Sequence, residues 1–207
     1  MMDREDKKEL RTQEKLLQAA ITEFAENGLA GARVDRIARR AGVNKAMLYY
    51  HFQSKDKLYR AVINQHITRV ANAVGSMLSE VESLEQALQT LANAYAAMFA
   101  QSPEFVPLAL RELAAGGHRV KAAVEQIFQP AGIPHRMVDL LEQGIAEGRY
   151  RVVDPAQTIV SFVGMNLFYL ILWPLVHSLW DIKDEEKFRE ERPRQVVDLL
   201  LHGLLAR

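Results

Sequence analysis

Cysteine is absent from this chain of 207 residues, and neither sign of charge is in excess. Without thiols the chain has no disulfides and no thiolate chemistry, which fits a reducing, cytoplasmic compartment. The amino-terminal segment is charged and lacks the apolar run of a secretory signal. Basic and acidic residues each number 26. A function that depends on charge must therefore rest on where the charges lie, not on their sum.

Signals for catalysis and for metal binding are also missing. The six histidines are scattered over positions 51, 66, 118, 135, 177 and 202. None of them has the HExxH spacing or another metal-ligand spacing, and no glycine-rich phosphate loop occurs. We therefore expect that the chain is not an enzyme, and we expect no metal and no cofactor.

Helical periodicity and helix-ending residues account for nearly the whole chain. The hydrophobic content of 49% is enough to bury a sizeable core. The expected helices cover about 7–27, 34–41, 45–51, 54–78, 83–101, 103–115, 118–128, 134–148, 154–180 and 185–206. No segment has a convincing strand period, and residues 149–153 come nearest to one. The sequence predicts an all-α fold.

The segment from Arg33 to Leu58 predicts two short helices joined by a tight turn. Gly42 supplies the turn, and Asn44 is a good N-cap for the second helix. The second helix carries a lysine and three polar-tipped rings, namely Lys45, Tyr49, Tyr50 and His51. A helix that only filled a core would not need them, whereas rings and cations reach base edges and phosphates in a DNA groove. The pattern indicates a DNA-reading module.

Positive charge is concentrated on the same segment. Between Gly28 and Arg60, eight basic residues face two acidic ones, a local net charge of +6 in a neutral chain. For a charge run alone, a solvated basic face is the simpler interpretation. Because this run coincides with the helix-turn-helix pattern, phosphate binding is favoured.

Residues 10 to 60 resemble the N-terminal domain of TetR-type transcriptional regulators. The matching stretches are LRTQEKLLQAAITEFAENG and VDRIARRAGVNKAMLYYHFQSKDKLY, of which AGVNKAMLYYHFQSKDKL is the specific part. Members of that family usually have Ser or Thr at Asn44, Gly at Ala46, Thr at Met47, and Thr or Ser at Arg33. Because of these departures, the operator sequence of another family member does not transfer to this chain, whereas the predicted fold is unaffected.

The resemblance implies a domain division and a function. Residues 1–55 would form a three-helix DNA-binding domain with the helix-turn-helix, and residues 56–207 a larger helical domain for effector binding and dimerisation. A homodimer joined by its last two helices would bind a palindromic double-stranded operator as a repressor, and a small molecule would release it. The alternatives are a DNA-architectural protein of the same fold without an effector, and a small-molecule-binding protein that has lost DNA binding.

The expected DNA contacts are of two kinds. Base edges are assigned to Lys45, Ala46 and Tyr50, with Asn44 nearby. Phosphates are assigned to Arg33, Tyr49, His51 and Lys55, of which Tyr49 rests on the resemblance. The alternatives are an exposed Lys55 without a partner, a half-buried aromatic at Tyr49, and a packing role for His51 beside Phe52.

The 22 residues from Ile159 to Trp180 contain no Asp, Glu, Lys or Arg. Their length matches a membrane span. Asn166, Pro174, His177 and the lack of basic clusters at either end argue against one. We expect no membrane contact, because a helix that is apolar all round can instead be covered on every side by protein. The resemblance implies that this helix packs inward on its own domain and outward on a partner chain.

An effector pocket is expected to have mostly apolar walls with a few polar groups. The candidates share an apolar or aromatic character and helical spacing: Tyr95, Met98, Phe99, Phe105, Met137, Phe162, Met165, Asn166 and Tyr169. Asn166 is the most suggestive, because an amide inside an apolar helix needs hydrogen-bond partners. The alternative for each candidate is an ordinary core residue. The predicted effector is apolar or amphipathic.

Overall fold

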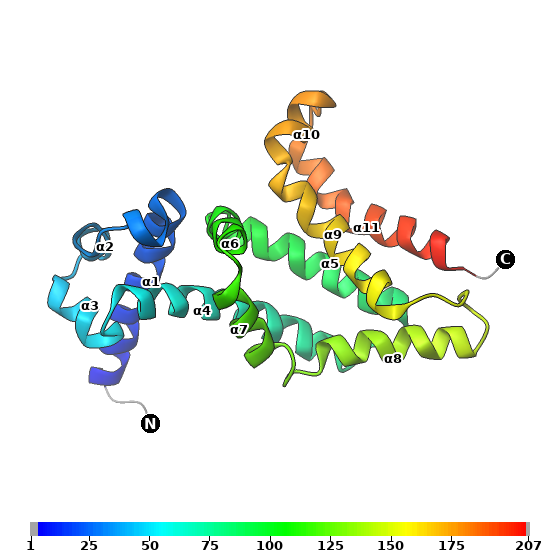
Figure 1. The fold of residues 1–207 in the computed structure, drawn as a ribbon, viewed down its shortest axis with the longest axis horizontal. Helices are drawn as coiled ribbons and strands as arrows, with labels where there is room; N and C mark the ends of the chain where they lie inside the picture. The colour runs from blue at the N-terminus through cyan, green and yellow to red at the C-terminus, as the bar shows by residue number, and fades with distance from the viewer. Residues whose placement is uncertain (1–3, 206–207) are drawn as a thin grey trace. The chain divides into compact units, whose positions relative to one another are not determined.

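A computed structural model describes residues 4–205, and this part of the chain is almost entirely helical (Figure 1). Its helices are α1 (Arg4–Gly31), α2 (Val34–Ala41), α3 (Lys45–Phe52), α4 (Lys55–Leu78), α5 (Leu84–Gln101), α6 (Phe105–Ala114), α7 (His118–Ile127), α8 (Ile133–Ala146), α9 (Pro155–Ile171), α10 (Trp173–Leu179) and α11 (Glu185–Leu204). Within the described residues no strand occurs, and Tyr150 and Leu205 form an isolated bridge. The predicted all-α fold is confirmed.

The chain divides into two compact units. The first unit comprises the chain up to Ile67 together with Glu104–Ala123, and the second comprises Thr68–Pro103 and the chain from Val124 onward. Helix α4 belongs to both units, because it runs from Lys55 to Leu78. This division by compactness differs from the functional division between residues 55 and 56, which stays a prediction.

The first unit contains the helix-turn-helix formed by α2 and α3. Helix α2 ends at Gly42, whose φ of 69° and ψ of 30° are left-handed, so that its N–H reaches the last carbonyls of α2. Asn44 then caps α3, since its Oδ1 accepts the N–H of Met47 at 2.9 Å. The predicted turn and the predicted cap are both confirmed.

Helix α1 supplies much of the core of the first unit. Leu16, Ile21 and Phe24 are buried, and the Phe24 ring meets the Tyr59 ring edge-on at 4.8 Å. Leu10, nearer the start of the helix, is 45% exposed, because buried contacts begin only further along the helix. The helical backbone breaks at Gly28 (φ 65°, ψ 176°), where the sequence predicted its end.

The second unit has a core formed mainly by α5, α8, α9 and α11. Its most deeply buried side chains include Leu88, Met137, Leu140, Leu141, Phe162 and Val196. Ser83 and Asp154 cap α5 and α9 by accepting the backbone N–H groups of Gln86 and Gln157, three residues further on. Helix α8 passes under the Tyr150 ring at Gly144, where a Cβ would overlap the ring carbons.

The apolar run of residues 159–180 is divided between two helices. Helix α9 ends at Ile171, and α10 starts at Trp173 after a break at Leu172. Proline at position 174 has no N–H for a continuous helix, which explains the break. In the described part of the chain, no helix is both long enough and apolar enough to cross a membrane. The last helix, predicted to reach Ala206, ends at Leu204, and Ala206 lies outside the described residues.

Candidate nucleic-acid interface

Helix α3 has two faces of opposite character. Leu48 and Phe52 are buried in the first unit, with exposed fractions of 0% and 5%. The other face is exposed and consists of Lys45, Ala46, Tyr49 and Tyr50. Tyr49 is 43% and Tyr50 67% exposed, although large aromatic side chains usually bury most of their area. The predicted base-edge residues therefore share one open surface of α3 with a predicted phosphate ligand.

Several cations of the motif are paired with carboxylates of the same unit. Lys45 lies 2.9 Å from Asp35, Arg40 2.8 Å from Glu26, and Arg60 2.8 Å from Asp56. The hydrogen bond to Asp35 raises the pKa of Lys45, so its ammonium is charged at neutral pH. Exposed pairs of this kind contribute little stability, so a phosphate can replace the carboxylate.

Lys55 lies at the start of α4 and is tied to the end of α1. Its Nζ donates hydrogen bonds to the carbonyls of Ala30 at 3.2 Å and Ala32 at 3.0 Å. Lys55 is thus not the partnerless lysine of the alternative interpretation. An ammonium has three N–H donors, so a phosphate contact remains compatible with these two bonds.

Arg33 stands at the N-cap of α2 without a side-chain capping bond. Its backbone N–H donates instead to Oε1 of Glu23 at 3.1 Å, and the guanidinium of Arg36 lies 3.8 Å from the same oxygen. Glu23 is fully buried, a role that the sequence analysis missed. A glutamate within the apolar face of the lead helix was the available signal. The side chain of Arg33 is exposed, as a phosphate contact requires.

Tyr50 and His51 interact with each other and with neighbouring groups. A hydrogen bond to Glu9 raises the pKa of the Tyr50 phenol. The His51 ring packs edge-on against Tyr50 at 5.1 Å and lies tilted against Phe52 at 6.2 Å. Its Nε2 is buried and has no hydrogen-bond partner among the described residues. His51 thus packs as one alternative expected, while a ring nitrogen is left for a further partner.

An ion network fixes the first turn of α4, directly after Lys55. Arg119 of α7 contacts Asp56 at 2.7 Å and the buried Glu112 of α6 at 3.3 Å. Burial, together with the charge of Glu112, raises the pKa of Tyr59 to about 12. These residues and Lys55 also line a cavity of about 680 Å³. Sequence reasoning missed the network, because its members are far apart in the chain.

Most of the predicted effector residues belong to the core of the second unit. Met137, Phe162 and Asn166 are almost fully buried. Asn166 Nδ2 donates to the carbonyl of Phe162 at 2.9 Å, so its own helix supplies a partner. Tyr95 and Met98 are partly buried against the same core, and burial raises the pKa of Tyr95.

The nine candidates lie in different parts of the described structure. Phe99 and Tyr169 line a cavity of about 340 Å³ between α5, α9 and α11, together with Arg189. Met165 faces a different groove. Phe105 belongs to the first unit, where its ring stacks on His66 at 4.6 Å. The nine candidates therefore do not all line this cavity, and their part in effector binding stays a prediction.

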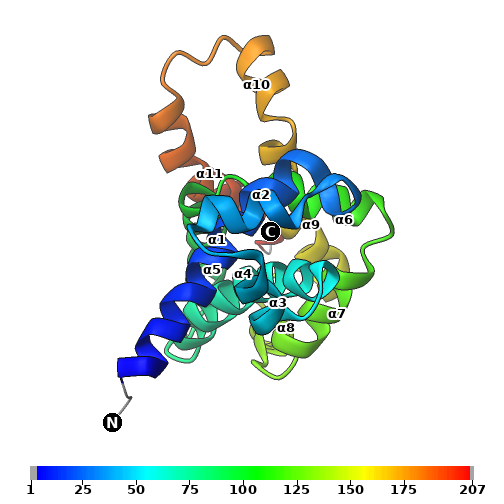
Figure 2. The same cartoon turned by 90° about the vertical axis from the view of Figure 1, so that its left-hand side faces the viewer.

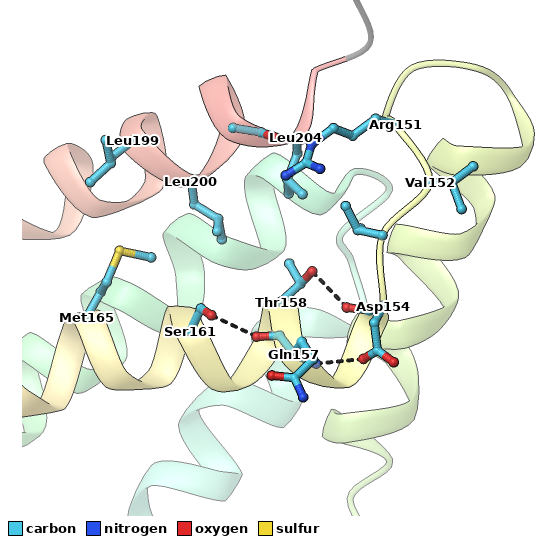
Figure 3. Close-up of a pocket in the computed structure, with 12 residues that line it drawn as sticks. Arg151, Val152, Asp154, Gln157, Thr158, Ser161, Met165, Leu199, Leu200 and Leu204 are labelled. Atoms are coloured by element: carbon cyan, nitrogen blue, oxygen red, sulfur yellow. Dashed lines mark hydrogen bonds between the residues drawn. The ribbon is translucent and has the colours of Figure 1, made fainter.

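Helices α9 and α11 of the second unit present an exposed, weakly polar surface. On α9, Val160, Ser161, Gly164 and Phe168 are exposed, and Leu199 on α11 is 67% exposed. A groove of about 440 Å³ lies between the two helices, lined on one side by α9 and on the other by α11 (Figure 3). This surface corresponds to the expected contact with a partner chain.

Two family models match the chain. Residues 16–62 match bacterial regulatory proteins of the tetR family, and residues 85–200 match the tetracyclin repressor-like C-terminal domain. The chain therefore belongs to the TetR family, and the resemblance found in its sequence is confirmed. Proteins of this family bind DNA and dimerise.

Individual relatives agree with this assignment. The HTH-type transcriptional repressor NicS of Pseudomonas putida is 30% identical over 142 residues, which cover 68% of this chain and just under two thirds (66%) of NicS. The ketosteroid transcriptional regulator KstR2 of Mycobacterium tuberculosis has a TM-score of 0.72 at 21% identity, covering 94% of this chain and 95% of KstR2. FadR of Bacillus subtilis, solved in complex with stearoyl-CoA, has a TM-score of 0.71 at 18% identity, covering 92% and 98%. These two structures share the fold.

Proposed function

We propose that the chain is a cytoplasmic, DNA-binding transcriptional repressor that acts as a homodimer on a palindromic operator. Residues 1–55 contact DNA, and residues 56–207 bind an effector and dimerise. The two recognition helices of the dimer enter successive major grooves, roughly 34–36 Å apart. The name of the relative NicS supports repression over activation.

The exposed face of α3 carries this proposal. A lysine, a methyl group and two phenols lie on one open surface along the first two turns of the short helix α3. Lysine and phenol groups donate hydrogen bonds to phosphates and base edges, and a small Ala46 lets the helix approach the groove floor. Both phenols stay exposed on this surface, Tyr49 at 43% and Tyr50 at 67%.

The test is operator binding by Lys45→Ala, with a DNA site selected from a random pool by the purified wild-type protein. Loss of this cation should weaken binding about tenfold and reduce the slope of log affinity against log salt by about 1. Fluorescence anisotropy at several salt concentrations measures both quantities.

Lys187→Ala is the matched control. Lys187 is also exposed and also faces a carboxylate, Glu191 at 3.9 Å, but it lies on α11. The Lys187→Ala variant should have the same operator affinity as the wild type and the same slope of log affinity against log salt. If the Lys45 and Lys187 variants behave alike, or if the wild type selects no sequence, the DNA-reading proposal fails.

The proposed effector is a small apolar or amphipathic molecule. The cavity at Phe99 and Tyr169 supports this class, because alanines of α5 form an apolar wall and charged groups of α11 stand at its edge. The effector must bind the DNA-incompetent state more tightly, or no release follows. Release of labelled operator on titration with candidate amphiphiles measures this effect.

A further inference from the structure

A cavity of about 680 Å³, the α1–α6 cavity, lies within the first unit. Helices α1 and α6 pack against each other in this unit (Figures 1 and 2). The cavity is lined by the end of α1, the first two turns of α4 and parts of α6 and α7, and its lining includes Gly28, Lys55, Tyr59, Arg111, Ala115 and Arg119. Its size is that of a site for a small molecule.

The two carboxylates of the lining already have partners within the chain. Asp56 lies 2.7 Å from Arg119 and 2.8 Å from Arg60. Oε2 of Glu112 lies 3.3 Å from the guanidinium of Arg119, and its Oε1 accepts the backbone N–H of the same residue at 3.0 Å. Neither carboxylate therefore needs a cation from a ligand.

Lys55 and Arg111 are the other two cations of the lining. In the described part of the chain, neither has a carboxylate within ion-pair distance. Lys55 donates to the carbonyls of Ala30 and Ala32, and Nη2 of Arg111 donates to the carbonyl of Glu26 at 3.5 Å. An ammonium has three N–H donors and a guanidinium has five, so donors remain on both side chains.

The alternative role of these two cations is only to satisfy the carbonyls at the end of α1. The guanidinium of Arg111 does lie against the backbone break of α1, since its Nη1 is 3.7 Å from the position that a Cβ would take at Gly28. Its bond to Glu26, however, is at the limit of hydrogen-bonding distance. The other donors of the guanidinium therefore stay open to a ligand that is rich in acceptors.

We propose that the α1–α6 cavity binds a small organic anion, namely a carboxylate with a compact apolar body, through Lys55 and Arg111. Three cations and two carboxylates line the cavity, a net charge of +1 that a monoanion neutralises. An arginine side chain holds a carboxylate with two parallel hydrogen bonds. Leu29, Ala30 and Ala115 offer an apolar wall to the rest of the molecule. This site is separate from the effector cavity proposed in the second unit.

Binding at this site would weaken operator binding, because both ligands use Lys55. This part of the inference rests on the proposed function, in which Lys55 contacts a DNA phosphate. Two of its three N–H donors are on the carbonyls at the end of α1, so one donor is left for either the anion or the phosphate. Saturating anion should lower operator affinity about fivefold, and operator should lower anion affinity by the same factor.

Isothermal titration calorimetry of the full chain tests the site with two carboxylates of different shape, naphthoate and octanoate, and with their uncharged amides. At least one carboxylate should bind with a dissociation constant below about 1 mM, and its amide should bind about tenfold more weakly, because the amide lacks the charge that the two cations neutralise. Inorganic phosphate is the third probe. It should bind more weakly than the carboxylate, because it has no apolar body.

Two substitutions locate the site. Arg111→Gln removes an exposed cation, Ala115→Phe fills the cavity without changing a charge, and each should weaken carboxylate binding about tenfold or more. Ala115 is exposed and has a φ of −84°, which larger residues adopt, so the fold should tolerate the ring.

Arg69→Gln is the matched control for Arg111→Gln. Arg69 is also exposed, but it lies on α4 outside the cavity. The Arg69 variant should bind the carboxylate as the wild type does. Far-ultraviolet circular dichroism checks that every variant remains folded, and operator binding without the anion should match that of the wild type in both arginine variants.

A further variant distinguishes this site from the effector cavity of the second unit. Ala97→Phe narrows the cavity at Phe99 and Tyr169. It should leave carboxylate binding at the α1–α6 cavity unchanged. If Ala97→Phe abolishes the binding and Arg111→Gln does not, the carboxylate occupies the effector cavity and the inference is overturned.

The remaining outcomes separate this inference from the proposed function. If neither carboxylate binds, if the amide or inorganic phosphate binds as tightly, or if the Arg111 and Arg69 variants behave alike, the anion site is wrong, while operator binding by the wild type leaves the proposed function standing. If the carboxylate binds but operator affinity does not change, the competition for Lys55 is wrong. If the carboxylate binds in the cavity and the wild type selects no operator, the proposed function fails and the anion site stands.

Discussion

The open face of α3 and the stripe of apolar side chains on α9 and α10 are the two surfaces where exposed residues depart most from ordinary helix surfaces. The first presents Lys45 and two phenols beside further cations of the motif. The second presents Phe168, Leu175, Leu179 and Trp180 without a charge in 22 residues. Each surface suits a different kind of partner. A polyanion satisfies the cations, and a second apolar surface removes the stripe from water.

The contrast teaches that net charge and total hydropathy are poor guides to partners in this molecule. The chain is neutral, yet one helix-turn-helix carries a local excess of +6. Its mean hydropathy is −0.12, yet Val160, Phe168, Leu175 and Leu179 are exposed on the consecutive helices α9 and α10. The position of each residue type on its helix decides which partner it selects.

The largest expected difference between the two surfaces is the salt dependence of the binding that each one supports. A DNA contact that neutralises several phosphates should weaken by roughly 10³-fold or more between about 50 and 200 mM salt. The dimer dissociation constant should change by no more than about threefold over this range, because apolar burial is little screened. Anisotropy with operator DNA and sedimentation equilibrium measure the two dependences. An equally steep salt dependence of dimerisation would contradict an apolar α9 seam, the dimer contact expected on that helix.

Gly164→Arg should convert the dimer into a folded monomer. A Cβ at Gly164 meets nothing within 4 Å in the chain itself, so the fold should tolerate the substitution. In the seam the guanidinium would be buried without a partner, at a cost of about 3–5 kcal/mol, which raises the dimer dissociation constant by between about 10² and 10⁴. Operator affinity should fall with it, because a monomer contacts one half-site.

Gly75→Arg is the matched control for this substitution. Gly75 is also a helical glycine with open space around it, but it lies on α4. The dimer dissociation constant of the Gly75→Arg variant should match that of the wild type. Should both arginine variants remain dimeric, the α9 seam is wrong.

Alkaline pH should act on the first unit through Tyr59, with a smaller effect. Its pKa of about 12 lies above the usual 10, so folding favours the protonated phenol. This contribution to stability is complete below pH 10 and is lost as the pH rises from 10 toward 12. Tyr59→Phe should be about 1 kcal/mol less stable at pH 8, because it loses the hydrogen bond to Glu112, and the difference should shrink by pH 11.

Urea unfolding at the two pH values measures that difference. Tyr49→Phe, which removes a phenol whose ring is 43% exposed on α3, is measured beside it as the control. A Tyr59→Phe difference that is equal at pH 8 and pH 11 would show that the phenol proton does not contribute to folding.

Local features of the fold were predictable because their causes lie within a few residues. The turn at Gly42 needs a left-handed backbone, and the caps at Asn44, Ser83 and Asp154 need a short polar side chain three residues before a free N–H. The family match followed from the same segment. These features depend on spacing alone, which the sequence displays directly.

The candidate sites were predictable only in part. The exposure of Lys45, Tyr49 and Tyr50 agrees with the predicted reading face. Chemistry and helical spacing predict the effector residues, but these two criteria do not show which side chains share a cavity. Phe105 shows the difficulty, because its aromatic ring serves a stack with His66 in the other compact unit.

The sequence by itself determined the helices, the helix-turn-helix and the charge of its segment, since periodicity, capping and composition act over short distances. Tertiary structure decided the destinations of individual polar groups. It placed the Lys55 ammonium on the carbonyls at the end of α1, buried Glu23 beneath Arg33, and joined Asp56 to Arg119. Such pairings join residues 10 to 63 positions apart, and only packing of helices brings them within hydrogen-bonding distance.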